Sequence, residues 1–201
     1  MISSAPVMAM VAVRHSLVVR VTHWINLLVF LSLIVSGAAI LLAHPRFYWG
    51  ETGAFGSPAL LELPLPLNLD QSGWGRSLHF LSAWVCVLNG SVYVLAGFIS
   101  HRFGKENYTA PQRFTYLAVV FILFPLMIAS GLAMSPAVMS ALPFIVRMFG
   151  GHQSARTVHF FITDILVVFV VGHVVMVYLA GFRSRMRGMT TGREVPVKES
   201  L

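Results

Sequence analysis

The strongest constraint on this sequence is a set of four long apolar runs, each about as long as a helix that crosses a membrane. The hydrocarbon core of a bilayer is about 30 Å thick, and about 20 helical residues are needed to span it. The predicted spans are residues 21–43, 77–100, 114–134 and 157–182. Pro125 lies inside the third span and predicts a kink there. The runs lack the alternation of a transmembrane strand, so the sequence predicts an all-α membrane protein, a four-helix transmembrane bundle.

The composition agrees with a membrane protein. The chain has 201 residues, of which 57% are hydrophobic and 10% are charged. A soluble domain carries about a quarter charged residues. The net charge of +7 is not read as a nucleic-acid partner, because the basic residues lie in short segments between the apolar runs. The expected surroundings are therefore the lipid bilayer.

The distribution of basic residues predicts the orientation. Ten of the fourteen Lys and Arg residues fall on one side of the predicted spans. The positive-inside rule places that side, and both termini, in the cytoplasm. The expected organisation is a cytoplasmic N-terminal segment 1–19, a membrane domain 20–182 with an outer loop 44–75, and a basic tail 183–201. The N-terminus lacks the basic region of a signal peptide, and the tail is expected to contact anionic lipid headgroups.

Short repeated patterns indicate that a helix pair is duplicated. The segment IVSGA at 34–38 in the first span is matched by IASGL at 128–132 in the third. The run GRSLHF at 75–80 opens the second span, and ARTVHF at 155–160 opens the fourth. The small Ser-Gly steps are expected where a helix backbone or a flat ring comes close.

The duplication is incomplete at two positions. The place in the third span that corresponds to His23 is occupied by Leu117. The place in the second span that corresponds to His173 is occupied by Tyr93. The third span therefore contributes no histidine.

Four of the eight histidines lie inside the predicted spans or at their edges. Ionisable side chains within a membrane are costly and are functional by default, although a lone histidine can also be a hydrogen-bonded packing residue. The four are His23, His79, His159 and His173. The others lie in predicted loops and are expected to be surface groups; they are His15, His44, His101 and His152.

His159 and His173 are fourteen residues apart on one predicted helix. Fourteen residues at about 100° each fall about 40° short of four full turns, so both rings face the same way. At about 1.5 Å per residue, they lie about 21 Å apart along the axis. That distance is too great for one metal ion and predicts two sites, one near each membrane face.

The topology pairs these residues with the other two. His23 and His173 both lie toward the cytoplasmic side, and His79 and His159 both begin their helices on the outer side. Each pair can supply two axial nitrogens to a haem iron, which predicts two b haems. Because both axial positions are then filled, such haems transfer electrons and do not bind oxygen.

Three of the paired histidines follow an arginine in the pattern Arg-x-x-His. The arginines are Arg20, Arg76 and Arg156. An arginine three residues earlier lies on the same helix face, where it can bind a haem propionate while the histidine binds iron. The alternative is that these arginines only mark helix ends.

Two polar or reactive residues lie within the spans. Asp164 is the only acidic residue there. It is either a proton carrier or hydrogen-bond partner near the outer haem, or a polar contact with Ser or Tyr of another helix. Cys86 is the only cysteine and is expected to be a small buried hydrophobe.

With these residues in place, the chain resembles the bacterial cytochrome b561-like family over roughly residues 14–185. That family includes the cytochrome b subunits of nickel-iron hydrogenases, formate dehydrogenase gamma subunits and thiosulfate reductase cytochrome b subunits. The resemblance rests on RVTHW at 20–24, on RSLHF at 76–80, and on the spacing of fourteen between His159 and His173.

The resemblance implies the same ligand pairs and an electron-transfer subunit of an oxidoreductase complex in the bacterial inner membrane. Such subunits exchange electrons between membrane quinone and a periplasmic enzyme. The segment HPRFYWGETG at 44–53 is similar to subunits paired with molybdopterin oxidoreductases, and the outer loop 44–75 is the expected docking site.

Two alternatives remain open from the sequence. One is a stand-alone b561 oxidoreductase that passes electrons between quinone and a small species such as superoxide. The other is a non-redox transporter or membrane scaffold whose histidines are packing groups. No catalytic residue is predicted in the chain itself.

Overall fold

The structure is a computed structural model that describes residues 15–53, 57–65, 73–101 and 110–192. Parts of the predicted N-terminal segment, outer loop and basic tail lie outside the described residues. So do some of the basic residues on which the predicted orientation depends, namely Arg14, Arg102, Lys105, Arg193 and Lys198. The described chain is mostly helical, as the apolar runs predict.

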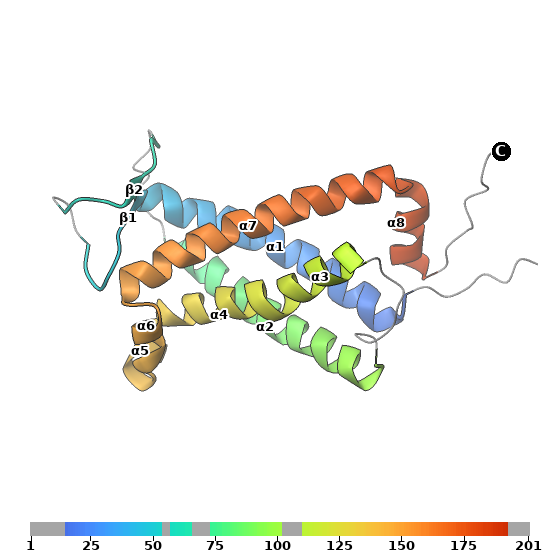
Figure 1. The fold of residues 1–201 in the computed structure, drawn as a ribbon, viewed down its shortest axis with the longest axis horizontal. Coiled ribbons are helices and arrows are strands. Elements are labelled where there is room, and N and C mark those ends of the chain that lie inside the picture. The colour runs from blue at the N-terminus through green and yellow to red at the C-terminus, as the bar shows by residue number, and fades with distance from the viewer. Residues whose placement is uncertain (1–14, 54–56, 66–72, 102–109, 193–201) are drawn as a thin grey trace, which may run out of the picture.

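Four long helical segments run side by side along the long axis of the molecule (Figure 1). They are α1 (Leu17–Ala43), α2 (Trp74–Ile99), a composite segment within 110–133, and α7 (His152–Leu179). All four are long and apolar enough to cross a membrane. Helices suit these runs because every backbone polar group within lipid must be satisfied inside the segment. The prediction of four membrane-compatible helices is confirmed.

The third segment changes its winding in the middle. It consists of α3 (Ala110–Ala118), the π-helix η2 (Val119–Leu123) and α4 (Phe124–Ala133). Pro125 has no N–H to donate and its ring clashes with the carbonyl four residues earlier, at Phe121. The π-helix covers that carbonyl and ends two residues before the proline. The irregularity predicted at Pro125 is therefore present as a π-helical turn.

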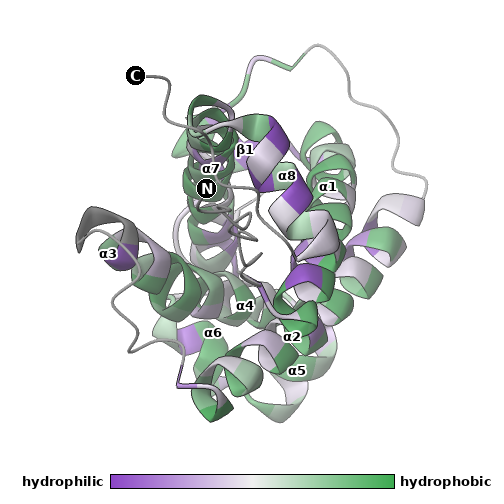
Figure 2. Ribbon diagram, turned by 90° about the vertical axis from the view of Figure 1, so that its right-hand side faces the viewer, coloured by the Kyte–Doolittle hydropathy of each residue, from purple (hydrophilic) through white to green (hydrophobic). Residues whose placement is uncertain are grey.

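Apolar side chains cover the outside of the bundle, and small polar side chains lie within it. Leu28, Leu88 and Val168 are 69%, 65% and 71% exposed. Figure 2 shows hydrophobic residues over most of the long helices and hydrophilic ones on α8. The buried polar residues are Thr22, Ser36, Ser82, Asn89, Ser130, Ser154 and Thr157. This distribution is that of a chain surrounded by lipid.

The helices pack mainly as two pairs. One pair is α1 with α2, and the other is the composite α3–η2–α4 segment with α7. In the first pair, Ser32 and Ser82 hydroxyls lie 2.7 Å apart, and Asn89 Nδ2 donates to the Thr22 carbonyl at 2.8 Å. In the second pair the core is apolar and consists of Val119, Ile162 and Leu166, with Phe30 of α1 packed against it.

Different elements lie at the two ends of the bundle (Figure 1). At one end, β1 (Arg46–Phe47) pairs antiparallel with β2 (Leu61–Glu62), and the short helices α5 (Pro136–Ala141) and α6 (Phe144–Met148) lie at the same end. We call this the hairpin end. At the other end α8 (Phe182–Thr191) turns away from α7 after Gly181, whose φ of 94° suits glycine. We call this the α8 end.

Candidate haem sites

At the hairpin end, histidines of α2 and α7 face each other. The ring centroids of His79 and His159 lie 6.2 Å apart, and the ring planes are inclined by 62°. His79 is the sixth residue of α2 and His159 is the eighth residue of α7, so both lie near the ends of their helices at the hairpin end. The structure thus brings together one of the pairs that the topology predicts.

Toward the α8 end, histidines of α1 and α7 form the second pair. The ring centroids of His23 and His173 lie 6.4 Å apart at an angle of 53°. Trp24 packs edge-on to His23, and Phe169 stacks on His173 at 6.2 Å. His173 is exposed, and His23 Nδ1 is buried without a hydrogen-bond partner among the described residues. Buried polar atoms normally have a partner, and for this atom the described residues do not supply one.

The separation within each pair matches that of two imidazoles bound to one iron. A metal–imidazole bond is about 2 Å long, and the ring centre lies roughly 1 Å beyond the nitrogen. Two rings on opposite sides of one iron therefore have centroids about 6 Å apart. The described residues contain no cluster of three or more His, Cys, Asp or Glu side chains that would form a conventional metal cage. The donor sets fit axial ligation of two haems.

Each histidine of the hairpin-end pair contacts a Ser-Gly step of a preceding helix. Ser36 Oγ lies 3.0 Å from His79 Nδ1, and Ser130 Oγ lies 3.0 Å from His159 Nδ1. The glycine after each serine faces the same imidazole. The Ser-Gly steps were predicted to admit a backbone or a flat ring, and the ring that they contact here is the imidazole itself.

Two of the three arginines of the Arg-x-x-His pattern donate to backbone carbonyls. Arg20 donates through Nε to the Met189 carbonyl at 3.4 Å and through a terminal nitrogen to the Thr190 carbonyl, both in the last turn of α8. Arg76 is exposed. The propionate role of these arginines stays a prediction, since each guanidinium has five donors and these bonds leave some of them available.

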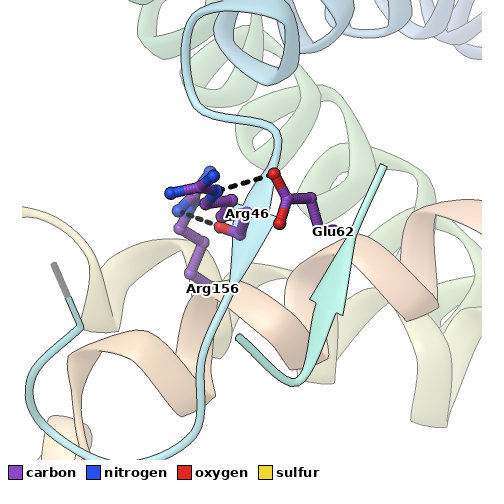
Figure 3. A network of polar contacts seen from close by, with 3 residues as sticks. All are labelled: Arg46, Glu62 and Arg156. Carbon is purple, nitrogen blue, oxygen red and sulfur yellow. Dashed lines mark hydrogen bonds and ion pairs between the residues drawn. The ribbon is translucent and has the colours of Figure 1, made fainter. Parts of the chain in front are cut away.

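Arg156 fastens the hairpin to α7 (Figure 3). Its guanidinium donates to the carbonyls of Arg46, at 3.0 Å, and of His44, and it lies over the Phe47 ring at 5.1 Å. Arg46 in turn forms a 2.8 Å ion pair with Glu62 across the two strands, which raises the pKa of Arg46. Burial, and then the nearby charge of Arg156, lower the pKa of His44. Arg156 is thus both one turn from His159 and part of the hairpin's anchorage.

Further hydrogen bonds hold the segment that follows β1 to α7. The Thr157 hydroxyl donates to the Tyr48 carbonyl at 2.7 Å, and the Gly50 N–H donates to Ser154 Oγ at 2.7 Å. Thr157 and Ser154 are fully buried. Because these residues lie within five positions of His159, the first part of the predicted outer loop is fixed relative to the histidine pair.

Asp164 lies on the exposed face of α7. The structure therefore does not bring its carboxyl to the His79–His159 pair. The alternative reading, a contact with Ser or Tyr of another helix, also has no support among the bonds of the described residues.

One polar pair was not predicted from the sequence. The hydroxyls of Tyr93 on α2 and Tyr116 on α3 lie 2.5 Å apart. Tyr93 occupies the place that corresponds to His173 in the duplicated pattern, and Tyr116 adjoins Leu117, which corresponds to His23. The site that the duplication relates to the His23–His173 pair is therefore occupied by a tyrosine pair. The repeat could have indicated Tyr93, but not its partner.

Comparison with known proteins identifies a matching family and a similar protein. A family model described as prokaryotic cytochrome b561 matches residues 14–192. The chain is 29% identical over 190 residues to a putative protein-methionine-sulfoxide reductase subunit, YedZ1, of Azospira oryzae, with 80% of this chain and 87% of the relative covered. No solved structure matches the chain.

Proposed function

The chain belongs to the prokaryotic cytochrome b561 family, and from that premise we propose that it is a dihaem subunit that transfers electrons between membrane quinone and a periplasmic oxidoreductase. Family membership makes it a multi-pass cytochrome b membrane subunit that binds haem b. The number of haems, their ligands, the quinone and the partner enzyme belong to the proposal.

The observation that carries the proposal is the pair of matched histidine separations. Centroid distances of 6.2 and 6.4 Å fit one iron between each pair, and α7 supplies one ligand to each. When bound, haem iron supplies one-electron transfer between its two oxidation states. His79 with His159 would hold one haem, and His23 with His173 would hold the other.

The surrounding residues would hold the cofactors and control their potentials. Arg20, Arg76 and Arg156 are proposed to donate from their guanidinium groups to haem propionates. The proton-carrier role of Asp164 stays a prediction that its outward position does not favour, because the carboxyl has no direct path to a histidine pair. The apolar exterior keeps water from the sites and so contributes to the haem potentials.

The partner is proposed to dock at the hairpin end. The relative from Azospira oryzae is described as a subunit of a putative protein-methionine-sulfoxide reductase, which supports a separate redox enzyme as partner. The hairpin is bonded to α7 next to His159 and exposes Trp49 and Leu60, at 62% and 59%. A molybdopterin enzyme seated there would lie beside the His79–His159 pair.

A stand-alone oxidoreductase acting on a small species such as superoxide is the second candidate. The partly apolar hairpin, which is bonded to α7, favours a protein partner, because a small diffusing substrate would not need such a surface. Co-purification separates the two: a stable complex with a periplasmic enzyme supports the first, and quinol-dependent activity of the purified lone chain with superoxide supports the second.

The absorption spectrum and haem content of the purified full-length chain test the proposal directly. We expect a reducible b-type spectrum and two haem b per chain by extraction and quantification. A colourless protein would exclude the redox function and favour the transporter or scaffold. One haem per chain would exclude the assignment of two histidine pairs.

A further inference from the structure

The two serines that contact the hairpin-end histidines are equivalent in position and bonding. Ser36 lies on α1, the helix before that of His79. Ser130 lies on α4, which is separated from the helix of His159 only by the short α5 and α6 and packs against it. Both serines are fully buried. Water therefore does not compete for their hydroxyl groups.

The bonding of each serine defines the direction of its bond to histidine. The Ser36 hydroxyl donates to the Ser32 carbonyl at 2.7 Å, and the Ser130 hydroxyl donates to the Met127 carbonyl at 3.0 Å. A hydroxyl has one proton to donate, so a serine that gives it to a carbonyl of its own helix accepts from the imidazole. In that arrangement the Nδ1 atoms of His79 and His159 carry the proton. That tautomer leaves the lone pair on Nε2 free to bind a metal.

The following glycine shapes the space for the same ring edge. A Cβ atom on Gly37 would lie 3.5 Å from His79 Cε1, and one on Gly131 would lie 3.4 Å from His159 Cε1. A side chain at either position would therefore be in van der Waals contact with the ring edge that carries Nδ1 and Cε1. Each Ser-Gly step thus offers that edge a hydrogen bond with the serine and open space at the glycine.

We propose that Ser36 and Ser130 are positioning residues that hold His79 and His159 in the Nδ1–H tautomer, direct Nε2 toward the haem iron, and lower the potential of that haem. The inference rests on the proposed function, because it presumes that these histidines bind haem. A hydrogen bond accepted from the outer N–H raises the basicity of the ligand, which favours ferric iron. His23 Nδ1 has no such acceptor among the described residues, so the effect belongs to the hairpin-end site.

Potentiometric titration of the purified full-length protein tests the inference. In Ser36→Ala and in Ser130→Ala, we expect the midpoint potential of one haem to rise while the other keeps its value. The expected change is about three- to tenfold in the ratio of ferrous to ferric iron at fixed potential, and tenfold corresponds to about 59 mV for one electron. Ser36→Thr retains the hydroxyl and should keep the wild-type potential.

Ser82→Ala is the matched control. Ser82 is a buried serine of α2 that bonds Ser32 and no histidine, so its loss should leave both potentials unchanged. If both Ala variants retain two haems at wild-type potentials, the inference is overturned and the proposed function stands. If the Ala variants lose one haem while Ser36→Thr keeps it, positioning is supported; loss in Ser36→Thr as well shows that only buried volume matters and overturns the inference. A wild-type protein without haem would instead refute the proposed function.

Discussion

The outward position of Asp164 follows from its spacing to His159. Five residues at about 100° each place the two side chains about 140° apart around α7. The histidine faces the bundle, and the carboxyl therefore faces lipid or another protein. Depth in the membrane alone suggested a role near the haem, but the angle around the helix separates the two groups.

Asp164→Asn is expected to leave both haem potentials and their pH dependence unchanged. The reason is that the carboxyl lies on the exposed face of α7 and does not contact either histidine pair. Redox titrations at several pH values from about 6 to about 8, the range in which histidine titrates, measure this. A loss of pH dependence in the variant would restore the proton-carrier role.

His159→Ala is expected to remove one haem and leave the other. His173 on the same helix keeps its own partner, His23, at 6.4 Å, so the second site stays intact. Quantification of extracted haem should fall from two per chain to one. His152→Ala, at the start of the same helix and outside both pairs, is the control and should retain two. Two haems in His159→Ala would contradict the pairing.

The four histidines and their proximity in pairs were predictable, because helix length and topology determine which residues lie at equal depth. The bonds of Ser36 and Ser130 were not, since many helical serines donate only to their own helix. The carbonyl partners of Arg20 and Arg156 were also missed. The pattern Arg-x-x-His gives the side of a helix on which an arginine lies, but not which acceptors a distant segment brings there.

At the scale of elements, α8 is the main departure from expectation. The basic tail was expected to be a solvated segment, yet its first part, Phe182–Thr191, is a helix whose last carbonyls accept bonds from α1. Trp24 Nε1 donates to the Met189 carbonyl at 3.2 Å, beside the bonds of Arg20. Basic groups at a helix C-terminus stabilise it by satisfying carbonyls that have no partner within the helix. No local signal in 182–191 reveals these distant partners.

Arg20→Gln is expected to loosen α8 from α1. The variant loses the bonds to the Met189 and Thr190 carbonyls. Because these bonds are partly exposed to solvent, the two together are expected to stabilise the docked α8 by about 1 kcal/mol, and trypsin should cleave within α8 about fivefold faster. The measurement is the rate of limited proteolysis in detergent or lipid. Arg113→Gln, which removes an exposed arginine of α3, is the control. Equal cleavage rates in the two variants would show that α8 does not depend on Arg20.

At the scale of the whole molecule, the orientation is a prediction from the sequence that reporter fusions can check. Alkaline phosphatase fused after Leu63, in the hairpin, should be active because this end is expected outside the cytoplasm. The same reporter fused after Leu201 should be inactive, whereas a fluorescent protein there should fold and fluoresce. The opposite result would reverse the sidedness and place the proposed docking surface in the cytoplasm.

The fourteen-residue interval on α7 has an energetic consequence for a protein in an energised membrane. An electron passing between the two histidine pairs would move about 21 Å along the field, roughly two-thirds of the hydrocarbon thickness. Since a full crossing of one charge is worth about 2.3 kcal/mol per 100 mV, that step would gain or lose about 1.5 kcal/mol for each 100 mV of membrane voltage. The voltage would thus oppose electron flow in one direction and assist it in the other.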